Sequence, residues 1–218
     1  MINSKLDDKN IGLLKNLFWL RQELDVYCLI AANADSIAKK AVGKSFFWFL
    51  RRSCIDLIVL NICKIYESEG DHKLNSVSGV LKNITSEQLS ALDSSHIDDF
   101  IRKYDSPNKD ESLSTLSSTV AGFKKKHKKE LKRFTTFRNK VVAHSEFRFN
   151  PNDLPSYDVM ERLFGFGADF YMLVSAAFVS TASVSVVPCN LNSDRKVKVG
   201  LKKVLEKLGL PDIKTEME

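Results

Sequence analysis

Apolar residues recur at every third or fourth position along most of this chain, which is the period of an amphipathic α-helix. The second apolar segment is hydrophobic on nearly all sides, so we expect that helix to lie at the centre of the fold. We expect Trp19 and Trp48 to be core or interface anchors. The pattern predicts four long helices, at residues 5–33, 45–67, 113–143 and from 157 into the early 180s.

Shorter helical patterns accompany the long ones. Residues 76–104 predict a short helical insertion, the two prolines within 150–155 predict a break, and residues 197–208 predict a small basic helix. Nine glycines and five prolines are too few for a sandwich or barrel, which needs a turn about every 10 residues. We therefore predict an all-α, antiparallel helical bundle. Residues 1–190 would form the bundle, and residues 191–218 a basic C-terminal helix and tail.

The length and the cysteines restrict the class of protein. With 218 residues the chain can bury a core without disulfides or a structural metal. Its four cysteines form no CxxC pair and have no histidine at metal-ligand spacing, which favours free thiols in a reducing cytoplasm and no metal or other cofactor. The N-terminal segment lacks an apolar signal core, so we do not expect export. The uncharged stretch 170–187 contains four serines and one threonine and is shorter than the ~20 apolar residues of a membrane span, so we expect a buried helix there.

Positive charge is concentrated in one segment. The chain has a net charge of +6, yet residues 121–140 contain nine basic residues against the single acid Glu130, a net charge of +8. Such a block on an otherwise acidic chain indicates a polyanion partner. A run of lysines is also commonly just the solvated face of a helix, so both interpretations stand at this point.

This basic block leads into the sequence Phe-Arg-Asn-Lys-Val-Val-Ala-His at residues 137–144. On an ideal helix with ~100° per residue, Arg138 and His144 fall on the two margins of one apolar stripe. Burying such polar groups costs free energy unless each is paired. We expect His127, which lies in the stripe, to be packed rather than catalytic. The stripe consists of Phe123, His127, Leu131, Phe134, Phe137 and Val141.

The residues at the stripe margins allow two interpretations. In the structural one, Arg138 forms an ion pair inside the bundle, for instance with Asp56, and His144 interacts with the last carbonyls of its helix. In the chemical one, the same residues serve metal-free phosphodiester chemistry. Histidine transfers protons near neutral pH, and arginine binds a phosphate in bidentate fashion.

The arrangement of Arg138, Asn139 and His144, placed late in a long bundle helix, resembles the signature of the HEPN superfamily. The likeness covers roughly residues 10–185 and is greatest to bacterial abortive-infection members of that superfamily. HEPN proteins are helical bundles that usually dimerise, which brings two Arg–His motifs together in a composite site. The segments that carry the resemblance are residues 17–20, 46–57 and 138–144.

The resemblance implies a metal-independent endoribonuclease of a bacterial antiphage defence or toxin–antitoxin system, cleaving RNA through the ribose 2′-OH. Arg138, Asn139 and His144 would be catalytic, with Asp56 as a supporting acid; Asp56 could equally be an ordinary buried acid paired with a neighbouring arginine. Other members of the superfamily have lost catalysis, so the alternative is a non-catalytic module that binds RNA or a protein. The residues expected to contact the RNA backbone are Lys124, Lys125, Lys128, Lys129, Lys132 and Lys140.

The same resemblance implies a set of partners. We expect RNA, a second copy of the chain in a homodimer, and an antitoxin or another defence-system protein, but no membrane. Members that a nucleotidyltransferase antitoxin modifies carry a tyrosine two residues after the histidine, where this chain has Glu146. An antitoxin of that kind is therefore not indicated.

Overall fold

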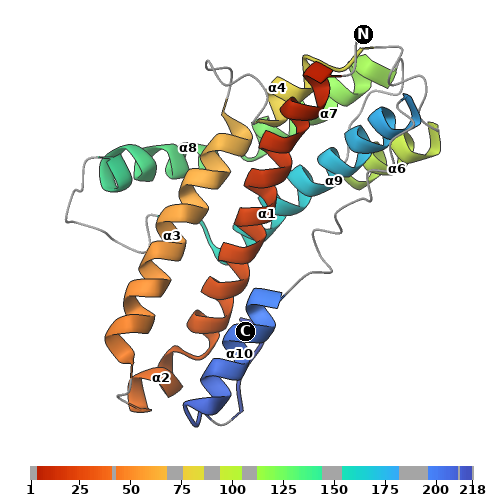
Figure 1. The fold of residues 1–218 in the computed structure, drawn as a ribbon. Helices are drawn as coiled ribbons and strands as arrows, with labels where there is room; N and C mark the ends of the chain where they lie inside the picture. Colours follow the sequence, from red (N-terminus) through yellow and green to blue (C-terminus); the bar gives the residue numbers. More distant parts are fainter. Residues whose placement is uncertain are drawn as a thin grey trace.

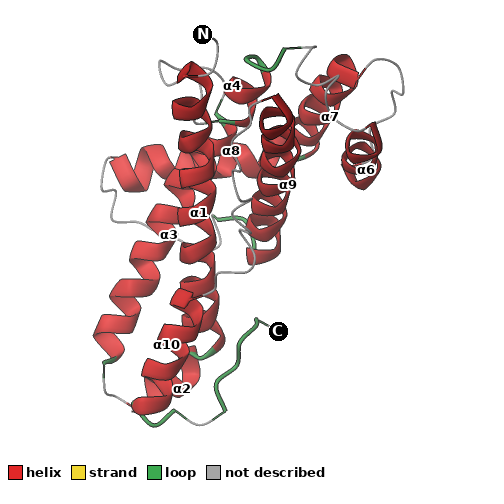
Figure 2. Ribbon diagram, turned by 45° about the vertical axis from the view of Figure 1, so that its right-hand side comes forward, coloured by secondary structure: helices red, strands yellow, loops and turns green. Residues whose placement is uncertain are grey.

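The computed structural model describes residues 4–40, 43–67, 76–85, 94–104, 112–143, 154–181, 196–210 and 212–217. All regular elements in these ranges are helices, which confirms the predicted all-α helical bundle (Figures 1 and 2). The elements are α1 (Ser4–Ala32), α2 (Ala34–Lys40), α3 (Lys44–Tyr66), α4 (Val77–Leu81), α6 (Ser94–Tyr104), α7 (Ser112–Lys126), α8 (Lys128–Phe137), the π-helical segment η1 (Arg138–Ala143), α9 (Tyr157–Thr181) and α10 (Lys196–Lys207).

The central helix is α1, which contacts α3, α9 and α10. It runs antiparallel to α3, and the two lie side by side in both ribbon views (Figures 1 and 2). Its leucines Leu13, Leu17, Leu20 and Leu24 are fully buried, as their spacing predicts. Helix α9 comes close to α1 at Gly167, where an added Cβ would lie only 3.0 Å from Leu17 Cδ2. The bundle core is therefore built around α1, in which all residues from 20 to 25 are buried.

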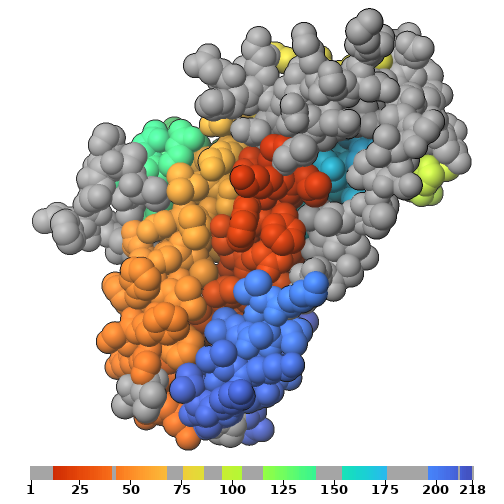
Figure 3. Space-filling view, viewed as in Figure 1, coloured from red at the N-terminus to blue at the C-terminus, as the bar shows by residue number. Residues whose placement is uncertain are grey.

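The position of α3 differs from the prediction that it would be central. Its C-terminal half is buried between α1 and α8, but its N-terminal half lies at the edge of the bundle (Figures 1 and 3). Phe46, Trp48 and Phe49 are 60%, 71% and 64% exposed. The prediction relied on apolar residues on all sides of α3, but the described helices cover only one side of its N-terminal half. Trp48 is therefore not a core residue.

The predicted third helix is present but changes its geometry twice. At His127 the backbone leaves the α-conformation, with φ −100° and ψ 19°, which separates α7 from α8. Backbone hydrogen bonds continue across this residue, from His127 N–H to Phe123 and from Leu131 N–H to the His127 carbonyl, both at 3.0 Å. From Arg138 onward the helix is π-helical. The ideal α-helical projection of the sequence therefore holds only up to Phe137.

The C-terminal helix α10 packs against α1, α2 and the start of α3 through a second core, which contains Leu29, Ile37, Phe47 and Leu205. Gly209, with φ 73°, ends the helix in a Schellman motif, in which the following residue donates its N–H to the Leu205 carbonyl at 3.2 Å. The following tail turns back to α1, where the buried Asn33 side chain bonds both backbone groups of Lys214, at 2.8 and 3.0 Å. The predicted domain boundary at residue 190 lies outside the described residues.

Helix α9 contains the described part of the uncharged stretch 170–187. Phe170, Tyr171, Leu173 and Val174 are buried against the bundle, as predicted. Within the described ranges, no helix has the length and apolar character needed to cross a membrane.

Candidate functional site

Arg138 stands at the junction between α8 and η1. Its Nη1 lies 3.4 Å from Oε2 of Glu67, the residue that follows the last residue of α3, and its Nε donates to the Asn139 side-chain oxygen at 3.2 Å. The Arg138 side chain is 32% exposed, so one side faces solvent. Burial raises the pKa of the neighbouring Cys63 thiol, and the positive charge of Arg138 opposes that shift. The guanidinium is therefore anchored to α3 yet accessible to a ligand.

The π-helical segment itself holds the first two residues of the motif. Its hydrogen bonds join residues five apart rather than four, which widens the helix and changes the direction in which successive side chains point. Segments of this kind occur frequently at functional sites. His144 follows η1 directly and lies outside the described residues, as does the side chain of Val141. The structure thus places Arg138 and Asn139 together, and the position of His144 remains a prediction.

Asp56 lies nearer the middle of α3 and pairs with Arg52 one turn away, at 3.4 Å. It is not the ion-pair partner of Arg138, which is Glu67. The two acids are eleven positions apart in sequence, about 16 Å along the helix axis. However, the Arg52 guanidinium lies 5.7 Å from the ring centre of Phe137, the residue directly before Arg138. Asp56 is therefore connected to the motif through Arg52, and its supporting role remains a prediction.

The lysines of the basic block fall into two groups. Lys125, Lys128, Lys129, Lys132 and Lys140 are exposed, which gives α8 and its flanks a solvated basic face. Helix α8 lies beside α3 (Figure 3).

Lys124 differs from those five lysines. Its ammonium donates to the Ser78 hydroxyl of α4 at 2.9 Å, and partial burial lowers its pKa. Five of the six predicted RNA-contacting lysines therefore face solvent, while Lys124 helps attach α4 to α7.

The opposite face of α7 and α8 carries the predicted apolar stripe. Phe123, His127, Phe134 and Phe137 are buried and Leu131 is half-buried. The His127 ring packs 4.6 Å from that of Phe123, and burial lowers the pKa of the imidazole. Neither ring nitrogen has a hydrogen bond within the described part of the chain. His127 is therefore packed in the apolar stripe, as expected.

Glu67 and Arg52 are site residues that sequence reasoning missed. Glu67 lies at the end of a predicted helix, 71 positions away from Arg138, and no local pattern connects the two. From the sequence, Arg52 is only one of two neighbouring arginines, with Arg51, that could pair with Asp56. Among the described residues, no group of three or more histidines, cysteines, aspartates or glutamates is arranged to hold a metal ion.

The chain matches the HEPN family described as AbiU2 over residues 4–190. It belongs to this family. Neither the curated proteins nor the solved structures contain a significant match. Membership of the AbiU2 HEPN family confirms the resemblance found in the sequence and indicates a nuclease or abortive-infection role.

Proposed function

We propose that this AbiU2-family protein is a metal-independent endoribonuclease of a bacterial antiphage defence or toxin–antitoxin system. The observation that carries the proposal is the half-exposed Arg138 guanidinium, held at the start of a π-helical segment beside Asn139. His144 follows this segment directly in the sequence. An accessible arginine followed closely by a histidine provides a phosphate-binding group and a proton-transfer group.

In the proposed mechanism the nucleophile is the 2′-OH of the substrate's own ribose. His144 takes the proton from this hydroxyl or gives one to the leaving 5′-oxygen. Arg138 stabilises the negative charge that develops on the phosphate, and Asn139 orients the phosphate or the histidine. In a homodimer the second protomer supplies a second set of these residues. An antitoxin or another defence protein would control when the site acts.

The first test is cleavage of single-stranded RNA by the purified protein in the presence of EDTA. We expect cleavage to persist and to leave a 2′,3′-cyclic phosphate and a free 5′-hydroxyl, because the nucleophile belongs to the substrate. His144→Ala should abolish cleavage, while DNA of the same sequence should stay intact because it lacks the 2′-OH. Gel analysis of end-labelled products distinguishes these outcomes. Loss of cleavage in EDTA, or cleavage of DNA, would contradict the mechanism.

A second test concerns the basic face of α8. Replacing Lys125, Lys128, Lys129 and Lys132 with glutamine should weaken RNA binding for all sequences alike. The slope of log affinity against log salt should become shallower by about 0.7 for each lysine that contacts a single-strand phosphate. Filter binding at several salt concentrations measures this slope.

A matched control removes four lysines from α10, namely Lys196, Lys198, Lys203 and Lys207. The two variants have the same net charge. An equal effect of both variants would show that only the net charge matters and that the α8 face is merely solvated.

The alternative is a non-catalytic module that binds RNA or a protein. The ion pair between Arg138 and Glu67 favours this alternative, because holding that ion pair would be a sufficient structural role for Arg138 without any catalytic one. RNA binding without any cleavage by the unmodified protein would support this alternative.

A further inference from the structure

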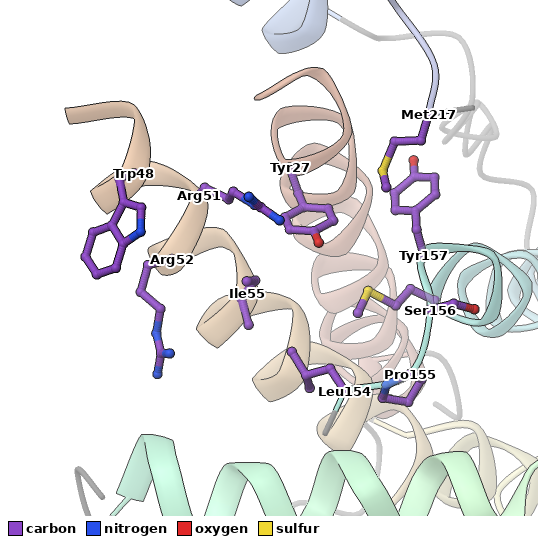
Figure 4. A pocket seen from close by; sticks show the side chains of 11 residues that line it. Tyr27, Trp48, Arg51, Arg52, Ile55, Leu154, Pro155, Ser156, Tyr157 and Met217 are labelled. Carbon is purple, nitrogen blue, oxygen red and sulfur yellow. The ribbon is translucent and has the colours of Figure 1, made fainter. Parts of the chain in front are cut away.

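A pocket of 510 Å³ lies between α1, α3, the start of α9 and the C-terminal tail (Figure 4). Its volume is within the range of small-molecule sites, which is about 300–1,000 Å³. Ile55, Leu154 and Met160 form a buried apolar part of its lining. Arg133 of α8 donates to the Leu154 carbonyl at 2.7 Å, so this wall is attached to the helix that leads into the motif.

Aromatic rings supply a second part of the lining. The rings of Tyr27 and Tyr157 are stacked at 6.2 Å with an angle of 24° between their planes. Trp48 contributes its indole from α3, and most of that side chain is exposed (Figure 4). Three aromatic side chains from three helices thus border one cavity. A flat aromatic ligand would find both apolar contact and stacking partners here.

The charge of the lining is positive. The Arg51 guanidinium lies 5.6 Å from the ring centre of Tyr27, and it has no acidic partner among the described residues. The nearby acids are already engaged. Asp56 pairs with Arg52, and Glu161 accepts hydrogen bonds from Arg21 and Tyr157. The positive charge of Arg51 can therefore pair with an anionic group of a ligand.

We propose that this pocket binds one nucleotide, with its base against the aromatic side chains and its phosphate at Arg51. Stacking on aromatic rings and arginine contacts to phosphate are the general means by which proteins hold single nucleotides of a strand. A free nucleotide and one residue of an RNA strand share this chemistry. The second arginine of the wall, Arg52, lies over the ring of Phe137, the residue directly before Arg138 in the sequence. The inference concerns binding alone and does not depend on cleavage.

Equilibrium dialysis with AMP tests the pocket. Arg51→Gln and Trp48→Ala should each weaken AMP binding by about tenfold. The first substitution removes the positive charge that binds the phosphate, and the second removes an aromatic ring that contacts the base. The matched controls are Arg102→Gln, an exposed arginine on α6, and Phe46→Ala, another exposed aromatic residue on α3 that does not line the pocket. Both controls should bind AMP like the unmodified protein. Ribose 5-phosphate, which lacks the base, should not bind measurably.

Fluorescence locates the bound base. The chain has two tryptophans, so in a Trp19→Phe variant all tryptophan emission comes from Trp48. AMP and a 2′-O-methylated adenine pentanucleotide, which cannot be cleaved through the 2′-position, should both quench this emission. Tighter binding of the pentanucleotide than of AMP would identify RNA as the source of the nucleotide, and equal binding would identify a free nucleotide.

Two results would overturn the proposal. One is the absence of quenching by both ligands at millimolar concentration. The other is an equal effect on AMP binding of the pocket variants and their controls. Because no cleavage is measured, a failure of the nuclease proposal would not alter these readouts, and their failure would not alter the cleavage result.

Discussion

Arg138→Ala is expected to lower the rate of RNA cleavage by roughly 100- to 1,000-fold, the usual effect of removing one group that stabilises transition-state charge. Glu67→Gln is expected to leave the rate within a few-fold of the unmodified protein. Both substitutions break the same ion pair, in which Arg138 Nη1 lies 3.4 Å from Glu67 Oε2. Only the first removes the positive charge. The pair of variants therefore separates a role at the phosphate from a role in holding α8 against α3.

The measurement is single-turnover cleavage of a labelled RNA, with circular dichroism to verify that both variants remain helical. The ion pair is partly exposed, so its loss should change stability by no more than about 1 kcal/mol. An equal loss of cleavage in both variants would show that the ion pair, not the charge at the phosphate, is what matters. Full activity of Arg138→Ala would rule out the proposed role of the arginine altogether.

Helix positions could be predicted from the sequence because they depend on local patterns. The expected helix at 5–33 is observed at Ser4–Ala32, and the one at 45–67 at Lys44–Tyr66. Both have long apolar periodicity and are followed by polar or small residues. Helix α2 was missed because it has only seven residues, of which Ile37 alone is buried, too few to show a period.

The site could be predicted only in part, because its geometry depends on contacts between distant segments. The motif residues Arg138 and Asn139 are found from the sequence, yet the π-helical segment that contains them has no recognisable local pattern. The ion-pair partner Glu67 belongs to another helix end. The pocket at Arg51 was also missed, since its lining comes from α1, α3, the start of α9 and the C-terminal tail. Packing between helices, rather than any one segment, determines these features.

A buried ion network between α1 and α9 is a further feature that the sequence did not reveal. Arg21, of which 3% of the side chain is exposed, bonds Asp25 at 2.8 Å and both carboxylate oxygens of Glu161 at 2.7 Å. The Tyr157 hydroxyl also donates to Glu161, and burial together with this carboxylate raises the pKa of Tyr157. The guanidinium lies 5.0 Å from the ring centre of Phe164. This network connects the central helix to the helix whose first residues border the pocket.

Arg21→Met is expected to lower the free energy of unfolding by about 3–5 kcal/mol, because it leaves two carboxylates without their buried cation. Urea titration followed by circular dichroism measures the change. Arg102→Met is the control, since it breaks the exposed ion pair with Asp99 and should cost roughly 0–1 kcal/mol. The triple variant Arg21→Met, Asp25→Asn, Glu161→Gln removes the isolated charges as well and should recover most of the loss. A single Arg21→Met variant as stable as the Arg102→Met control would show that the network does not hold α1 and α9 together.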